Sequence, residues 1–245
     1  MIASPLLSAA RSAAPVNPRA LTGGGEVVLL APHPDDETLG CGLAIAALAD
    51  AGLCVRVVVI TDGSHSHPRS ARFPPALLAR LRARELGRAL RHLTRRAGPP
   101  PVLLGYPDLS APACHVSRRA ACELIRPLIG PQTGAIWASW GGDPHTDHAR
   151  VARIAAMLHA EHPGLARWSY PIWGRFNTSL PAPASGEMVL IRAPALRARK
   201  RRALAAHASQ MTRLISDDPT GFVMCPEHQR HFLDHPEIFI REMPA

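Results

Sequence analysis

The stretch EVVLLAPHPDDE, residues 26–37, joins an aliphatic run to a turn of proline, histidine and acidic residues. Residues 26–31 are β-branched and aliphatic, as is typical of a buried strand. Residues 39–51 have the small apolar residues of a buried helix, which Gly52 ends, and residues 55–60 form a second aliphatic run. Strand, loop, helix and strand in this order predict a βαβ unit with parallel strands and a right-handed crossover.

The same alternation continues along the chain. We expect helices over residues 74–97, 117–129 and 147–161, and strands over residues 102–104 and 135–140. After residue 163 the pattern loosens, with a strand expected over 188–192, a helix over 197–215 and an edge strand over 237–242. The predicted fold class is α/β, with a mostly parallel sheet covered by helices on both faces and an irregular C-terminal extension.

The length of 245 residues suits one α/β domain, expected over residues 23–245. Residues 1–22 are Ala-rich, and Ser and Pro break their short apolar patch, so we expect a flexible N-terminal arm. No run reaches the roughly 18 to 20 apolar residues of a membrane span, so integral membrane association is not expected. Five cysteines without a Cys-x-x-Cys pair argue against a disulfide framework and favour a cytoplasmic location.

The formal net charge of +9 attracts anionic partners through the general field of the protein. The arginines of residues 80–96 are spaced along a predicted helix and have no aromatic residues between them that could stack on bases. A solvated helix face is the usual interpretation of such a run, so no nucleic-acid partner is expected.

Two predicted strand ends carry metal-binding side chains. The first is APHPDDE, residues 31–37, in which two prolines hold His33, Asp35 and Asp36 on a stiff turn. The second is GGDPHTDH, residues 141–148, where His145, Asp147 and His148 open a helix. Each cluster alone is compatible with helix capping and surface histidines. Because ligands bind where the strands of a parallel sheet end, the two clusters together favour one metal site.

Two imidazoles and one carboxylate would leave a position on zinc open for water, as in catalytic zinc sites. Hydrolysis of an amide also needs a base, an acid and a group that stabilises the oxyanion. Asp35, next to a candidate ligand, suits the base, and His145 suits the other two roles.

These residues resemble the motifs of the LmbE-like, PIG-L-type N-deacetylases, which share a Rossmann-like sheet, an HPDDE motif and a later HxDH motif. The resemblance implies that His33, Asp36 and His148 bind one Zn²⁺, that Asp35 is the general base, and that His145 stabilises the oxyanion. It also implies that Asp147 orients His145. TDGS at 61–64, GYPD at 105–108 and KxxALxxHxSQ at 200–210 are further family-like segments.

Some members of the family carry a tyrosine two residues before the HxDH motif, where this chain has Asp143. Either another group shares the stabilisation of the oxyanion, or Asp143 supports the site without binding the metal itself. The roles of Lys200 and His207 are also open. Asp108 and Arg84 resemble substrate contacts, although Asp108 can equally be a turn aspartate and Arg84 a solvated or salt-bridged arginine.

The resemblance implies a metal-dependent deacetylase acting on a small N-acetylglucosamine-like sugar or glycoconjugate. Two alternatives remain: a thiol-conjugate amidase on the same fold, and a carbohydrate-binding relative without activity. An intact Asp35 and His145 favour an enzyme, because metal binding alone needs neither. The substrate, the metal used in the cell and the oligomeric state stay open.

Overall fold

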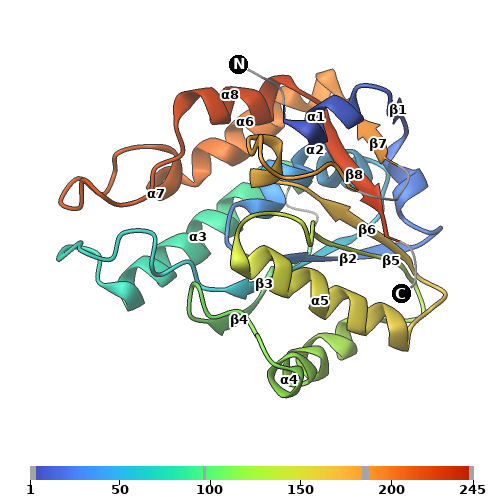
Figure 1. Ribbon diagram of the computed structural model, residues 1–245, viewed down its shortest axis with the longest axis horizontal. Helices are drawn as coiled ribbons and strands as arrows, with labels where there is room; N and C mark the ends of the chain where they lie inside the picture. Colours follow the sequence, from blue (N-terminus) through green and yellow to red (C-terminus); the bar gives the residue numbers. More distant parts are fainter. Residues whose placement is uncertain (1–3, 96–97, 184–187, 243–245) are drawn as a thin grey trace.

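A computed structural model describes residues 4–95, 98–183 and 188–242. Its described strands form one sheet in the order β1-β7-β8-β6-β5-β2-β3-β4 (Figure 1). The strands are β1 (Ala14–Pro15), β2 (Glu26–Ala31), β3 (Val55–Thr61), β4 (Val102–Tyr106), β5 (Thr133–Ser139), β6 (Ala166–Tyr170), β7 (Met188–Ile191) and β8 (Glu237–Arg241). All neighbouring pairs are parallel except those of β8, which runs antiparallel to β6 and β7.

Helices cover both faces of the sheet, which confirms the predicted fold class (Figure 1). They are α1 (Pro5–Ala10), α2 (Asp36–Asp50), α3 (Pro75–Thr94), α4 (His115–Ile125), α5 (Thr146–Glu161), α6 (Arg197–Ala206), α7 (Ala208–Met211) and α8 (Pro226–Asp234). Short 3-10 helices are η1 (Pro18–Leu21), η2 (Arg126–Leu128), η3 (Trp173–Arg175) and η4 (Pro194–Leu196). Among the described residues, no helix combines the length and apolarity needed to cross a bilayer.

Alternate residues of β2 feed two separate apolar cores, as the two-residue period of a strand requires. Val27 and Leu29 pack with α2, α3 and α6, whereas Val28 and Leu30 pack with α4 and α5. Both faces of β2 are therefore buried, which explains its continuous aliphatic run in the sequence.

The prediction of a flexible arm over residues 1–22 is wrong for its described part, residues 4–22. Leu6 of α1 and Leu21 of η1 are buried, and β1 pairs with β7 at the edge of the sheet. The segment is held by the burial of these two leucines, which no helical or strand-like apolar pattern in the sequence indicated. Residues 1–3 lie outside the described residues.

The prediction of an edge strand over residues 237–242 is also wrong, because β8 lies between β6 and β7 inside the sheet. The helix predicted over 197–215 is two shorter helices, α6 and α7. The helix predicted over 74–97 ends at Thr94, after which Arg95 adopts a left-handed φ of 51°; residues 96–97 lie outside the described part.

A buried ion pair joins the C-terminal segment to α2. Lys200 Nζ lies 2.7 Å from Glu237 Oε1 and donates to the carbonyl oxygen of Leu39 at 2.7 Å. Glu237 also accepts hydrogen bonds from the backbone N–H groups of Leu43 and Ala44. Both side chains are 1% exposed, so each charge depends on the other for compensation.

We expect Lys200→Met to lower the free energy of unfolding by about 3–5 kcal/mol, because it leaves the carboxylate of Glu237 buried without its cation. Urea unfolding monitored by circular dichroism measures the change. Arg201→Met, at an exposed position of the same helix, is the matched control. A Lys200→Met protein as stable as the unaltered one would show that the pair has no such structural role.

Candidate active site

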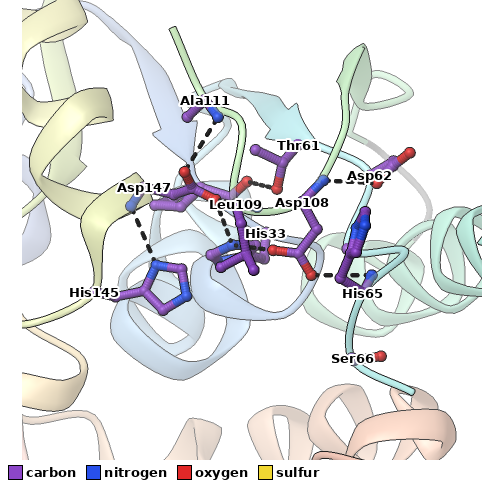
Figure 2. Close-up of polar contacts among 12 residues, drawn as sticks. His33, Thr61, Asp62, His65, Ser66, Asp108, Leu109, Ala111, His145 and Asp147 are labelled. Carbon is purple, nitrogen blue, oxygen red and sulfur yellow. Dashed lines mark hydrogen bonds and ion pairs between the residues drawn. The ribbon is translucent and has the colours of Figure 1, made fainter. Parts of the chain in front are cut away.

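The two predicted clusters meet at the carboxyl ends of β2 and β5, which are neighbouring parallel strands. His33 follows β2 directly, and His145 caps the N-terminus of α5, shortly after β5. The imidazole centroids of His33 and His145 are 4.7 Å apart, and those of His145 and His148 are 5.0 Å apart. Figure 2 shows His33 between the acidic residues that surround it.

One nitrogen of His33 faces two carboxylates. Its Nε2 lies 3.2 Å from Asp108 Oδ1 and 3.3 Å from Asp147 Oδ2 (Figure 2). Only a protonated nitrogen is stable there, so Nε2 carries hydrogen. In the neutral imidazole, the Nδ1 lone pair then points toward Asp36 Oδ2, 3.1 Å away.

His148 has the same arrangement from the other side. Its Nδ1 lies 3.2 Å from Asp143 Oδ2, and its Nε2 lies 3.3 Å from Asp36 Oδ2. Because Nδ1 donates to the carboxylate of Asp143, Nε2 keeps the lone pair of the neutral ring. This Nε2 is buried and has no hydrogen-bond partner among the described residues.

Two imidazole lone pairs therefore converge on one oxygen of Asp36, which is unfavourable unless a positive charge lies among them. A bound cation would supply that charge, as would protonated imidazoles. Without a cation, burial lowers the pKa of His148 but the carboxylates of Asp36 and Asp143 raise it more, to about 9. Hydrogen bonds to Asp108, Asp147 and Asp36 likewise outweigh burial and raise the pKa of His33 well above its usual value.

The donor set fits a divalent metal ion. Two groups of three side chains have potential ligand atoms within 4.8 Å of one another: His33 with His145 and His148, and His33 with Asp108 and Asp147. His145 is the poorer ligand, because its Nδ1 accepts a hydrogen bond from the backbone N–H of Asp147 at 3.2 Å, which leaves the proton on Nε2. The set of His33, Asp36 and His148 is the one whose lone pairs face one another.

Asp35 lies beside this set in a strained backbone conformation, with φ of 143°. Its backbone N–H donates to Glu37 Oε2 at 3.0 Å, and its Oδ2 accepts from Arg82 Nη2 at 3.2 Å. Burial raises the pKa of Asp35 to about 6, against the opposing effect of Arg82. A carboxyl group with this pKa can take up and release a proton near neutral pH.

Asp147 differs from its predicted role. Its carboxylate accepts from the backbone N–H groups of Leu109 and Ala111, at 2.8 and 3.1 Å, and contacts His33 rather than His145 (Figure 2). Only its backbone N–H reaches His145. Asp147 therefore orients His33 with its side chain and fixes the tautomer of His145 with its main chain.

The two predicted substrate contacts have different outcomes. Asp108 lines a cavity of about 470 Å³ at the site, and hydrogen bonding to His33 overcomes burial and lowers its pKa to about 2. Arg84 is exposed and does not line this cavity. The arginine at the site is Arg82, whose guanidinium also donates to the carbonyl oxygens of Pro34 and Gly63.

The sequence left the roles of Asp143 and His207 open and did not single out Glu37 or Arg82. Glu37 Oε1 lies 3.4 Å from His207 Nε2, so α7 and the HPDDE turn are linked behind Asp35. Asp143 accepts from the backbone N–H groups of residues 172–174 in addition to His148. Arg82 and Glu85 are three residues apart, so they lie on the same face of α3. Both side chains are buried, and Glu85 accepts hydrogen bonds from the backbone N–H and the hydroxyl of Ser209. This spacing of opposite charges was the signal in the sequence for a functional Arg82.

Comparison with known proteins shows which family the chain resembles. The model of a family described as PIG-L, GlcNAc-PI de-N-acetylase, matches residues 28–159. A 1D-myo-inositol 2-acetamido-2-deoxy-alpha-D-glucopyranoside deacetylase from Kineococcus radiotolerans is 29% identical over an alignment 165 residues long, which covers 54% of this chain and 44% of that protein. The alignment thus spans less than half the length of this curated relative.

Two solved structures share the fold. An N,N'-diacetylchitobiose deacetylase from Pyrococcus horikoshii, bound to an inhibitor, superposes with a TM-score of 0.65 at 22% identity, over 98% of this chain and 90% of that one. The zinc-inhibited form of the teicoplanin deacetylase Orf2 gives a TM-score of 0.61 at 19% identity, over 90% of this chain and 100% of that one. At these identities the two structures show a common fold alone.

Proposed function

The chain belongs to the PIG-L family, and we propose that it is a metal-dependent hydrolase that removes the acetyl group from an N-acetylglucosamine-like sugar or glycoconjugate. The observation that carries the proposal is the position of Asp36 Oδ2, 3.1 Å from His33 Nδ1 and 3.3 Å from His148 Nε2, next to Asp35 and His145. The named relative, a deacetylase of an acetamido sugar, supports the substrate class.

His33, Asp36 and His148 would hold the metal ion, and zinc suits this mixture of imidazole and carboxylate. When bound, zinc lowers the pKa of water and polarises a carbonyl oxygen. Other divalent metals also accept these ligands, so metal analysis of the protein identifies the native ion.

The remaining residues supply the proton transfers. Asp35 takes a proton from the water that attacks the carbonyl carbon of the acetamide. His145 donates a hydrogen bond from its Nε2–H to the developing oxyanion. The proton that Asp35 has taken from the water then passes to the departing amine. Asp147 keeps the proton on His145 Nε2 through its backbone N–H, at 3.2 Å from Nδ1.

The substrate proposal is tested with a panel of amides of increasing size. We expect acetate release from N-acetylglucosamine and its conjugates, measured with an enzyme-coupled acetate assay, because the cavity of about 470 Å³ suits a small molecule. Cleavage restricted to larger thiol conjugates would instead favour the amidase. Binding of the sugars without release of acetate would favour the carbohydrate-binding alternative.

Asp143 gives a further prediction. Asp143→Asn is expected to weaken metal affinity about 10- to 100-fold, because the carboxylate that orients His148 is replaced by a neutral amide. Competition with a chromogenic chelator measures the affinity, and Asp234→Asn, at an exposed position of α8, is the control. Equal affinities of the Asp143→Asn and control proteins would contradict the orienting role.

A further inference from the structure

A second and larger cavity, of about 580 Å³, lies between α1, α8 and the β7–β8 pair. Figure 1 shows α1 and α8 near these strands, on the upper side of the sheet as drawn. The cavity shares no lining residue with the candidate active site. Trp173, in the wall of the active-site cavity, contacts Phe176 and His228 of this one, with ring centroids 6.4 and 6.1 Å apart. The volume of this second cavity lies within the range of small-molecule sites.

Arg175 lines the cavity and carries a buried charge without a counter-ion. The side chain is 1% exposed, and its Nε and Nη1 donate to the carbonyl oxygens of Pro171 and Pro236. Its Nη2 has no hydrogen-bond partner, and Arg175 forms no ion pair, among residues 4–95, 98–183 and 188–242. The guanidinium carbon lies 5.2 Å from the centroid of the Phe232 ring, and this cation–π contact offsets part of the cost of burial. Buried guanidinium groups are normally also paired with an anion, and here the Nη2 donor is left unused.

Most of the other polar side chains of the cavity also favour an anionic ligand. Arg11 and Arg192 lie at its exposed rim, and neither forms an ion pair within the described part of the chain. The imidazole of His231 has a buried Nε2 without a partner there, and burial together with Arg175 lowers its pKa to about 3. The cavity is lined by three arginines and by one carboxylate, that of Glu227, which is exposed and lies 3.9 Å from the guanidinium of Arg230.

The rest of the wall is apolar. Leu7 and Ala10 of α1 face Leu190 of β7 and Ile238 of β8, and these residues belong to one small hydrophobic cluster. The ring of Phe176 stacks on His228 with centroids 3.8 Å apart. A ligand that fills this cavity therefore needs an apolar body and an anionic head.

We propose that this cavity binds a small organic anion, a carboxylate or phosphate ester with an apolar body, whose charged head pairs with Arg175, Arg11 and Arg192. Arg175 forms the inner contact, where burial strengthens a charge-assisted hydrogen bond. The two exposed arginines attract the anion to the entrance. This proposal does not depend on the deacetylase activity.

Calorimetric titration with phenylacetate, phenyl phosphate and 2-phenylethanol tests the proposal. The uncharged chelator 1,10-phenanthroline is kept present, so that anions bound to a metal ion do not contribute. We expect at least one anion to bind with a dissociation constant at or below about 1 mM, and the uncharged alcohol at least about 10-fold more weakly. The preferred anion assigns the head group as carboxylate or phosphate.

Variants locate the binding. The double variant Arg11→Ala/Arg192→Ala should weaken anion binding at least about 10-fold, and Ala10→Phe, which fills the cavity, should abolish it. Arg84→Ala removes an exposed arginine elsewhere and should leave the affinity unchanged. The proposal is overturned if no anion binds, if 2-phenylethanol binds as tightly as the anions, or if Arg84→Ala weakens binding as much as the double variant.

Discussion

Replacing Asp35 with asparagine is expected to reduce deacetylation about 10²- to 10⁴-fold while leaving one metal ion per chain. Asparagine has the size and shape of aspartate, which already adopts the strained φ of 143° at this position, so the turn should keep its shape. It cannot accept the proton of the attacking water, and the base is lost. Steady-state acetate release and metal analysis of the same preparation give the two results.

The control for this variant is Glu123→Gln, which neutralises an exposed carboxylate on α4. It should keep full activity. An Asp35→Asn protein with the activity of the control would remove Asp35 from the mechanism. A variant that loses its metal together with its activity would instead assign Asp35 to metal binding.

Removing the imidazole of His148 has the second large effect. His148→Ala should weaken metal affinity by more than about 100-fold, beyond the effect expected for an outer partner such as Asp143, because a ligand atom itself is lost. Acetate release should fall with metal content. Chelator competition measures the affinity, and thermal unfolding establishes that the variant is folded.

Two histidine variants make this result specific. His115→Ala removes an exposed imidazole on α4 and should change neither metal content nor activity. His145→Ala should keep the metal and lose activity, because His145 carries its proton on the nitrogen that would otherwise bind it. The reverse outcome, with metal lost in His145→Ala and kept in His148→Ala, would exchange the roles of the two histidines.

The sequence predicted the central part of the fold because the relevant signals are local. Residues 26–37 contain a complete strand, a proline-fixed turn and the start of a helix, and the turn holds three of the residues now found together. Parallel strands place their carboxyl ends on one edge, so the convergence with His145 and His148 followed from the fold class.

The errors concern relations between distant segments. Asp147 contacts Leu109 and Ala111 because the chain after β4 lies against the turn that follows β2, where Asp108 also contacts His33, and no local pattern reveals this. Arg84 lies two positions from Arg82, about 200° around the helix, so a shift of two residues exchanges the buried face for the exposed one.

The position of β8 could not be predicted for a related reason. An alternation of apolar and charged residues is as compatible with an edge strand as with an inner strand whose charged residue is paired. Here the charge of Glu237 is buried because it pairs with Lys200, which is distant in the sequence. The N-terminal segment depends likewise on Leu6 and Leu21, whose packing partners lie elsewhere in the chain.

We propose that a metal ion held by His33, Asp36 and His148 makes this protein a deacetylase. The direct test measures acetate release from N-acetylglucosamine conjugates by the purified protein as isolated, after removal of metal by a chelator, and after addition of about one equivalent of zinc or another divalent metal. We predict release that stops on chelation and returns with metal. Release that continues in metal-free protein would show that hydrolysis does not need the metal ion.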